Sequence, residues 1–301
     1  MIVTIEENDE GKRIDTYLKD MYDIPRTKIQ TAIKNKQVKV NDKFIKPAYK
    51  LKENDLLDFT ISDTEDTEIQ PEDIALDIRY EDENMLVVNK PSGMLTHPTT
   101  IEKTNTLVNA LLYKYKDNLS DINGKFRRGI VHRLDRNTSG LLMVAKNNKT
   151  HEYLANLIKN HEITKKYRAI LKGKYPLDDD VIDLPIGRNT NQPQKMMVTS
   201  DGKRSITKLK VLKRFKDATY VELTLITGRT HQIRVHTSFK GYPVFNDTLY
   251  GAGMAKIKTE EQVLQSFYLK FTKPFKDDTI EIQIEPDEKI KKVLKYFELR
   301  N

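Results

Sequence analysis

One polar stretch constrains this chain more than any other part of its sequence. Residues 128–146 read RGIVHRLDRNTSGLLMVAK, so a loop rich in charged and hydroxyl side chains lies between two apolar runs. The first run is Ile130 and Val131, and the second, residues 141–145, is continuous and typical of a buried strand. Because a loop held between buried strands is rigid enough to aim a side chain, residues 132–139 are candidates for a functional site.

Asp135 is the only acid in this loop. It is flanked by Arg133 and Arg136, which favour an ionised carboxylate at neutral pH. An acid beside an arginine is also common in surface turns, where the ion pair is purely structural. The local chemistry therefore leaves two interpretations open, a catalytic carboxylate and a structural ion pair.

The composition limits the class of protein. A chain of 301 residues fits two domains, or one large domain with a small one, and its 38% hydrophobic content suffices for a core. The absence of cysteine excludes disulfides, thiolate metal sites and cysteine nucleophiles. No apolar run approaches the roughly 18 residues of a membrane helix, and the first residues are acidic, unlike a signal peptide. We therefore expect a cytoplasmic protein without membrane contact.

Charge is distributed unevenly along the chain. The net charge is +8 overall, but it is −4 for residues 1–10, +8 for residues 11–52, −12 for residues 53–84 and +16 for residues 85–301. Two basic bodies joined by an acidic connector indicate a polyanionic partner, of which nucleic acid is the commonest. Ordinary solvated lysine remains the alternative.

Residues 11–58 have the pattern of a small α/β unit. A helix is expected from Arg13, and a second after Pro25, with Ile29, Ala32 and Ile33 as its apolar stripe. Short strands are expected at 38–40 and 56–59, and Arg26 and Lys28 lie on the polar side of the second helix, where they could contact phosphates. Residues 61–77 are acidic and poor in apolar side chains, which predicts a flexible linker.

The larger unit is expected to begin at residue 78. Its apolar patterns predict strands at 85–89, 141–145, 167–171, 206–211, 220–226 and 280–284, and helices at 106–115, 149–160 and 290–297. The helices do not strictly alternate with the strands. This order predicts an α+β fold with a mostly antiparallel mixed sheet flanked by helices.

A second polar stretch, residues 227–236, reads TGRTHQIRVH and follows the predicted strand 220–226. Thr230 is expected to cap a helix, which would place His231 and Arg234 on one face and His236 elsewhere. The start of a helix favours anions, and an arginine there can pair with a carboxylate through two hydrogen bonds. A solvated basic face is the alternative.

Three motifs together resemble the RluA/RluD-type family of pseudouridine synthases. They are GIVHRLDRNTSG at 129–140, RTHQIRVH at 229–236, and the K-x-Y-x-A-x-x-x-G pattern at 165–173. The segment 13–55 is similar to the S4 RNA-binding domain. The resemblance implies an S4-like domain at 1–60, an acidic linker at 61–77 and a pseudouridine synthase catalytic domain at 78–301.

The resemblance also implies an activity. Such an enzyme breaks the N1–C1′ bond of a uridine in RNA, rotates the uracil and rejoins it through C5. By position in the motifs, Asp135 is the catalytic nucleophile or base, Arg234 forms a salt bridge with it, and Tyr167 stacks on the target base. The reaction needs neither a cofactor nor a metal, and we expect a monomer with RNA as its partner.

Further side chains are candidates for substrate binding. They are Arg133, Arg136, His132, Thr138, Arg229 and His231 in the two polar stretches, and Arg26 and Lys28 in the S4-like unit. Large-subunit (23S) ribosomal RNA is the expected target, because family members with this appendage often act there. Two alternatives remain: the same chemistry on tRNA, and a non-catalytic RNA-binding or ribosome-assembly factor.

Other chemistries lack their required residues. A zinc base deaminase needs cysteine ligands, and the chain has none. The sequence contains no H-E-x-x-H metalloprotease motif, no P-loop and no G-x-S-x-G nucleophile motif. A glycosidase uses paired carboxylates, whereas the central loop offers one.

Overall fold

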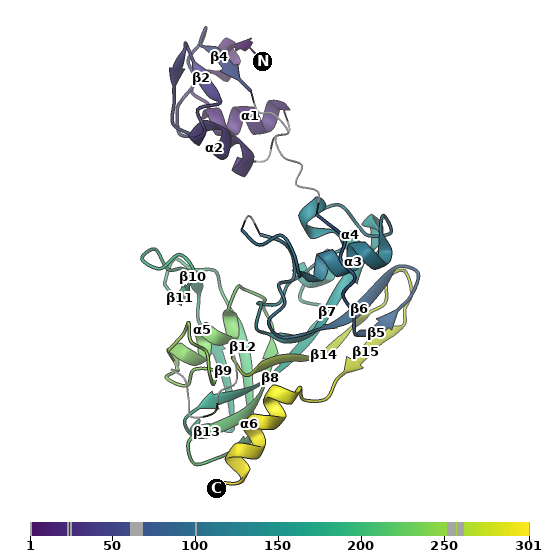
Figure 1. The fold of residues 1–301 in the computed structure, drawn as a ribbon. Helices are drawn as coiled ribbons and strands as arrows, with labels where there is room; N and C mark the ends of the chain where they lie inside the picture. Colours follow the sequence, from purple (N-terminus) through teal and green to yellow (C-terminus); the bar gives the residue numbers. More distant parts are fainter. Residues whose placement is uncertain are drawn as a thin grey trace. The chain divides into compact units, whose positions relative to one another are not determined.

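The computed structural model describes residues 2–22, 24, 26–60, 69–99, 101–251, 257 and 262–300. The chain divides into two compact units, Met1–Glu68 and Ile69–Asn301, which are described separately here (Figure 1).

The N-terminal unit packs two helices against a small sheet. Its elements are β1 (Ile2–Thr4), η1 (Glu7–Asp9), α1 (Ile14–Tyr22), α2 (Arg26–Lys34), β2 (Val38–Val40), β3 (Lys43–Phe44) and β4 (Leu56–Phe59). The strands pair antiparallel in the order β1-β4-β2-β3. Ile29, Ala32 and Ile33 are buried, so the predicted stripe of the second helix is confirmed. Pro25 lies outside the described residues.

A buried carboxylate joins the two helices of this unit. Asp15 accepts hydrogen bonds from Arg13 (3.0 and 2.9 Å) and from Arg26 (3.1 and 2.9 Å). These bonds, those of Arg13 most of all, lower the pKa of Asp15 to about 2, although burial opposes the shift. The guanidinium of Arg26 is therefore partly engaged within the protein.

The C-terminal unit is built on one large sheet. Its strands are β5 (Ile78–Glu81), β6 (Met85–Lys90), β7 (Ser139–Ala145), β8 (Thr164–Lys172), β9 (Asp179–Asp183), β10 (Ile186–Arg188), β11 (Met196–Val198), β12 (Ile206–Arg214), β13 (Ala218–Leu225), β14 (Leu264–Thr272) and β15 (Thr279–Gln283). Its helices are α3 (Leu107–Tyr115), η2 (Lys125–Arg127), α4 (Asn148–Lys159), α5 (Gln232–Phe239) and α6 (Glu288–Glu298).

The sheet is mixed and mostly antiparallel, as the sequence predicts. Its order is β5-β6-β7-β14-β8-β13-β12-β9, with β15 paired to β14, and β10 and β11 form a separate two-stranded sheet. Every pairing in the large sheet is antiparallel except that of β7 with β14. β14 thereby joins the half of the sheet that carries β6 and β7 to the half that carries β8 and β13.

Helices cover both faces of this sheet (Figure 1). Alternate residues of β6 and β7 face opposite sides, because side chains alternate along a strand. One face packs against α3, and the same cluster continues to Ile233 of α5. The opposite face packs against α4, and further along the sheet against α6. The two polar stretches lie on the face that α3 and α5 share.

The segment 69–77 belongs to the C-terminal unit, whereas its composition predicts that it is part of a linker at 61–77. Ile69 is buried in the core cluster around α3, and the backbone N–H of Glu72 donates to the carbonyl of Asn109. The Asp77 carbonyl accepts from the N–H of Asn89 in β6. Composition alone does not reveal this docking, because the anchoring contacts are only two apolar side chains, Ile69 and Leu76, together with hydrogen bonds of backbone and polar side-chain groups.

Gly140 allows the parallel pairing of β7 with β14. Its φ is +118°, and a Cβ there would lie 2.0 Å from the carbonyl oxygen of Ser266. We expect Gly140→Ala to lower the free energy of unfolding by at least about 3 kcal/mol, because backbone strain and a backbone clash add. Gly241→Ala is the matched control, since Gly241 also has positive φ (+85°) but no atom within 4 Å of a Cβ. Urea denaturation would measure both, and equal costs would contradict the clash argument.

Candidate active site

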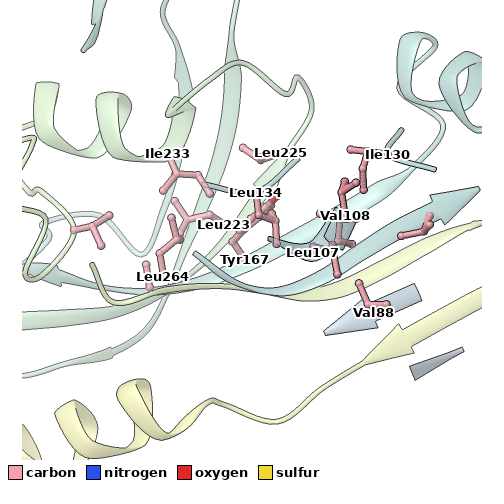
Figure 2. Close-up of a cluster of buried hydrophobic side chains, with 14 of the residues drawn as sticks. Val88, Leu107, Val108, Ile130, Leu134, Tyr167, Leu223, Leu225, Ile233 and Leu264 are labelled. Carbon is pink, nitrogen blue, oxygen red and sulfur yellow. The ribbon is translucent and has the colours of Figure 1, made fainter. Parts of the chain in front are cut away.

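The loop that carries Asp135 is fixed from several sides. Its Leu134 is buried and lies within the apolar cluster near Tyr167 and Leu223 (Figure 2). The Leu134 carbonyl accepts from the hydroxyl of Thr96 (3.0 Å), and the Arg136 carbonyl accepts from the ammonium of Lys90 (3.0 Å). These anchors hold the Asp135 backbone between two fixed carbonyls.

Asp135 pairs with Arg234 across 99 positions of sequence. Arg234 Nη1 donates to Asp135 Oδ2 at 2.9 Å. The other side of the guanidinium donates to Asp247, from Nε to Oδ2 (2.7 Å) and from Nη2 to Oδ1 (3.0 Å). Although burial lowers it, these two carboxylates raise the pKa of Arg234 above its usual value. One buried cation therefore bridges two carboxylates and fixes the direction of the Asp135 side chain.

The local structure at the start of α5 differs from the prediction. Thr230 is not the cap, because the cap position is His231, which has left-handed backbone (φ 56°) and makes no side-chain capping bond. The side chain of Gln232 accepts the hydrogen bonds of this turn instead: its Oε1 accepts from the N–H of Arg229 (3.0 Å) and from the hydroxyl of Thr227 (2.8 Å). His236 points away from Asp135, as predicted, and its Nδ1 and Nε2 contact Thr207 and Leu184.

His231 lies on the other side of the Asp135 carboxylate. Its Nε2 is 3.7 Å from Asp135 Oδ1, and its Nδ1 is 2.8 Å from the hydroxyl of Tyr250. That hydroxyl accepts from the N–H of Met196 (2.9 Å), so it can donate its own proton to Nδ1. Burial lowers the pKa of His231. A neutral ring with its proton on Nε2 directs that N–H toward Asp135.

Tyr167 forms an apolar wall beside the carboxylate. It comes from β8, is 7% exposed, and lines a pocket together with Asp135, Leu225, Ile233 and Leu264. Burial raises the pKa of Tyr167 to about 12, so the phenol is neutral. The pocket offers a flat aromatic face and aliphatic walls to a planar ligand, with one carboxylate at its edge.

The remaining candidates in the loop have different surroundings. Arg133 is exposed, and its Nη1 lies 3.2 Å from His97 Nε2. Arg136 pairs with Glu102 at the surface, away from Asp135. Thr138 lines the pocket, and its hydroxyl accepts from the amide of Gln262 (2.9 Å).

The other candidates divide between the two units. His132 Nε2 accepts from the N–H of Met143 (2.9 Å), and burial lowers the pKa of His132 to about 3. Arg229 is exposed at the rim of the pocket. Arg26 and Lys28 lie on α2 of the N-terminal unit, so the structure does not group them with the pocket residues.

Asp247 and Tyr250 are not among the predicted site residues. Both lie in a segment after α5 that resembles a further element of the same family, P-x-x-G-D-x-x-Y-G, but the resemblance gives neither residue a role. Asp247 is 1% exposed, and it also accepts from the backbone N–H groups of Leu249 (3.1 Å) and Tyr250 (3.2 Å). Its pairing with Arg234 follows only from the tertiary structure.

The described part of the chain contains no group of three or more histidine or acidic side chains placed to hold a metal ion. Within the same residues, no helix is both long and apolar enough to cross a membrane.

Comparison with known proteins decides the family. Residues 84–239, which span the Asp135 loop, Tyr167 and Arg234, match the family of RNA pseudouridylate synthases. The chain belongs to the RNA pseudouridylate synthase family. Residues 12–57 match the S4 domain. The chain is therefore an enzyme of the pseudouridine synthase class with an S4 domain at its N-terminal side, and the family's substrate is RNA.

Individual relatives agree with this assignment over most of the chain. It is 44% identical to an uncharacterized RNA pseudouridine synthase, YlyB, of Bacillus subtilis, over 93% of this chain and 92% of that one. It is 39% identical to ribosomal large subunit pseudouridine synthase D of Zymomonas mobilis, over 85% and 83%. Among solved structures, human RNA pseudouridylate synthase domain containing 1 is similar, with a TM-score of 0.57 and 30% identity over 70% of this chain and 83% of that chain.

Proposed function

We propose that Asp135 is the catalytic residue of a uridine-to-pseudouridine isomerisation. The observation that carries the proposal is the fixed carboxylate beside Tyr167 in a pocket with both apolar and polar walls: Oδ2 is held by Arg234, and the side chain keeps 20% exposure. In this role Asp135 takes part in breaking the N1–C1′ bond, and the same uracil returns through C5. One carboxylate suffices, since no net oxidation occurs: the C5 proton leaves and N1 gains a proton, so the product is an isomer of the substrate.

Tyr167 and Arg234 would serve Asp135 in different ways. Tyr167 offers its ring to a uracil that has left its own stack, and base stacking on aromatic side chains is how proteins hold unpaired bases. Leu225, Ile233 and Leu264 would exclude water from the detached base. Arg234, tied to Asp247, would act as a positioning residue that limits the rotation of the Asp135 side chain.

We propose large-subunit ribosomal RNA as the substrate. The support is the printed name of relatives such as the Zymomonas mobilis enzyme, together with an S4 domain beside the catalytic unit. This assignment places the enzyme in the cytoplasm, where ribosomes are made, and we expect it to act as a monomer. The same chemistry on tRNA is the second candidate.

Chemical mapping of pseudouridine in RNA from cells with and without this gene tests the substrate. The proposal predicts that one or more pseudouridines disappear from large-subunit ribosomal RNA when the gene is deleted, and return when it is restored. Sites lost only from tRNA would contradict the ribosomal assignment while keeping the chemistry.

The N-terminal unit is proposed as an RNA anchor. Deletion of residues 1–68 is expected to raise the Kd for a large RNA by about tenfold and to flatten its salt dependence, because the phosphate contacts made by this unit are lost. Filter binding at several salt concentrations measures both effects. A truncated chain that binds and modifies large RNA as well as the full chain would contradict the anchor.

A further inference from the structure

Lys165 occupies the lysine position of the K-x-Y-x-A-x-x-x-G motif. It lies two positions before Tyr167 on β8, so both side chains are on the same face of the strand. Lys166, between them, is on the opposite face and pairs with Glu222 at 3.0 Å. The strand therefore directs one lysine to a carboxylate and the other to the face of the active site.

The ammonium of Lys165 has no partner for its charge among the residues that the structure describes. Within the described part of the chain, no carboxylate lies within 4 Å of its ammonium and no hydrogen bond to it is formed. Partial burial lowers the pKa of Lys165, although the residue as a whole is only half-buried. A half-buried cation that no described carboxylate neutralises is suited to pair with a negative charge that arrives with the ligand.

Lys165 lines an open pocket, here called the outer pocket, which lies beside the pocket lined by Asp135, Tyr167 and Arg234, here called the base pocket. The two pockets share Asp135, Tyr167 and Arg229, but Lys165 and His132 line only the outer one. Gly228 forms part of its wall, and even a Cβ at Gly228 would lie 3.6 Å from the Lys165 ammonium. The absence of a side chain there leaves room for a ligand to approach the ammonium.

The other side chains of the outer pocket add positive charge. Arg133, Lys159 and Arg229 line it, and Asp135 is its only acid. Asp135 is already paired with Arg234, and Arg133 contacts the neutral ring of His97 rather than a carboxylate. A group of cations around a pocket with one engaged acid favours an anion of the ribose–phosphate backbone.

We propose that Lys165 binds a backbone phosphate of the RNA next to the target uridine, in the outer pocket beside Tyr167. This inference rests on the proposed RNA substrate. The alternative ligand would be the detached uracil, whose charge rises during the reaction. The phosphate is favoured because the base pocket is lined without Lys165, whereas the outer pocket that contains Lys165 is open and cationic.

The test compares Lys165→Met with Lys166→Met in the full chain, using an RNA that wild type modifies. Methionine fills a similar volume without charge, and thermal melting verifies that each variant is folded. For Lys165→Met we expect the Kd to rise roughly fivefold near 0.1 M salt, and the slope of log Kd against log salt to fall by about 0.7–0.9, the value of one phosphate contact. The single-turnover rate at saturating RNA should stay within about twofold, and Lys166→Met should match wild type.

Two results would overturn the proposal. One is an unchanged Kd and salt slope in Lys165→Met. The other is an unchanged Kd with a greatly reduced single-turnover rate, which would assign Lys165 to the reacting base. Failure of the proposed function can be distinguished from failure of this proposal. If the proposed function is wrong, the wild-type protein itself does not modify RNA. The Kd values of the variants can still be compared with any RNA that the wild-type protein binds.

Discussion

Asp135→Asn is expected to reduce the rate of pseudouridine formation by about 10³-fold or more, which corresponds to roughly 4 kcal/mol of transition-state free energy. Asparagine has the same shape but is neither a nucleophile nor a base, and among the described residues the Asp135 carboxylate is the only acid that lines the two pockets. Single-turnover assays with purified variant and excess enzyme measure the rate directly.

The same substitution should leave RNA binding within a few-fold of wild type. Asparagine keeps the shape of the Asp135 side chain, so the substitution leaves the pocket walls and the cationic residues around them in place. Filter binding provides this control. A variant that retained more than about a tenth of the wild-type rate would contradict the catalytic role of Asp135.

Arg234→Lys is expected to lower the turnover rate by about 10²-fold while the chain stays folded. The guanidinium contacts Asp135 with one nitrogen and Asp247 with two others. A lysine ammonium is a single point of attachment and cannot hold both carboxylates in these directions. Because lysine keeps the positive charge at position 234, the loss of turnover rate measures the positioning of Asp135 rather than the removal of a charge.

Arg204→Lys is the matched control for this substitution. Arg204 also makes a forked pair, with Asp183, but its side chain is 74% exposed and lies outside both pockets. Exposed ion pairs contribute little, so turnover and unfolding free energy should change little. If the Arg234→Lys variant had the same turnover rate as the Arg204→Lys variant, Asp135 would not depend on Arg234 for its position.

Much of the fold could be predicted from apolar periodicity. The helix 106–115 begins with its capping residue Thr106, as expected, and strands such as β7 and β13 follow their patterns. β14 was not predicted, although it joins the two halves of the sheet. Its first four residues are buried on both faces of the sheet and include the polar Gln265 and Ser266, so it lacks the alternation that identifies a strand.

The candidate site could be predicted in part, and the missing part depends on the tertiary structure. The motifs carry Asp135, Tyr167 and Arg234, and the structure brings these three to one pocket. The motifs do not indicate that Arg234 also binds Asp247, because that contact depends on the path of the chain after α5. They also give no reason for the left-handed backbone at His231, which moved the cap away from Thr230.

Release of tritium from RNA labelled at C5 of uridine tests the central claim most directly, since the C5 hydrogen leaves only when C5 bonds to C1′. We expect wild type to release tritium from large-subunit ribosomal RNA in proportion to the pseudouridine formed. Absence of release from both this RNA and tRNA, by a folded protein that binds them, would contradict the assignment of the Asp135 pocket as an isomerising active site.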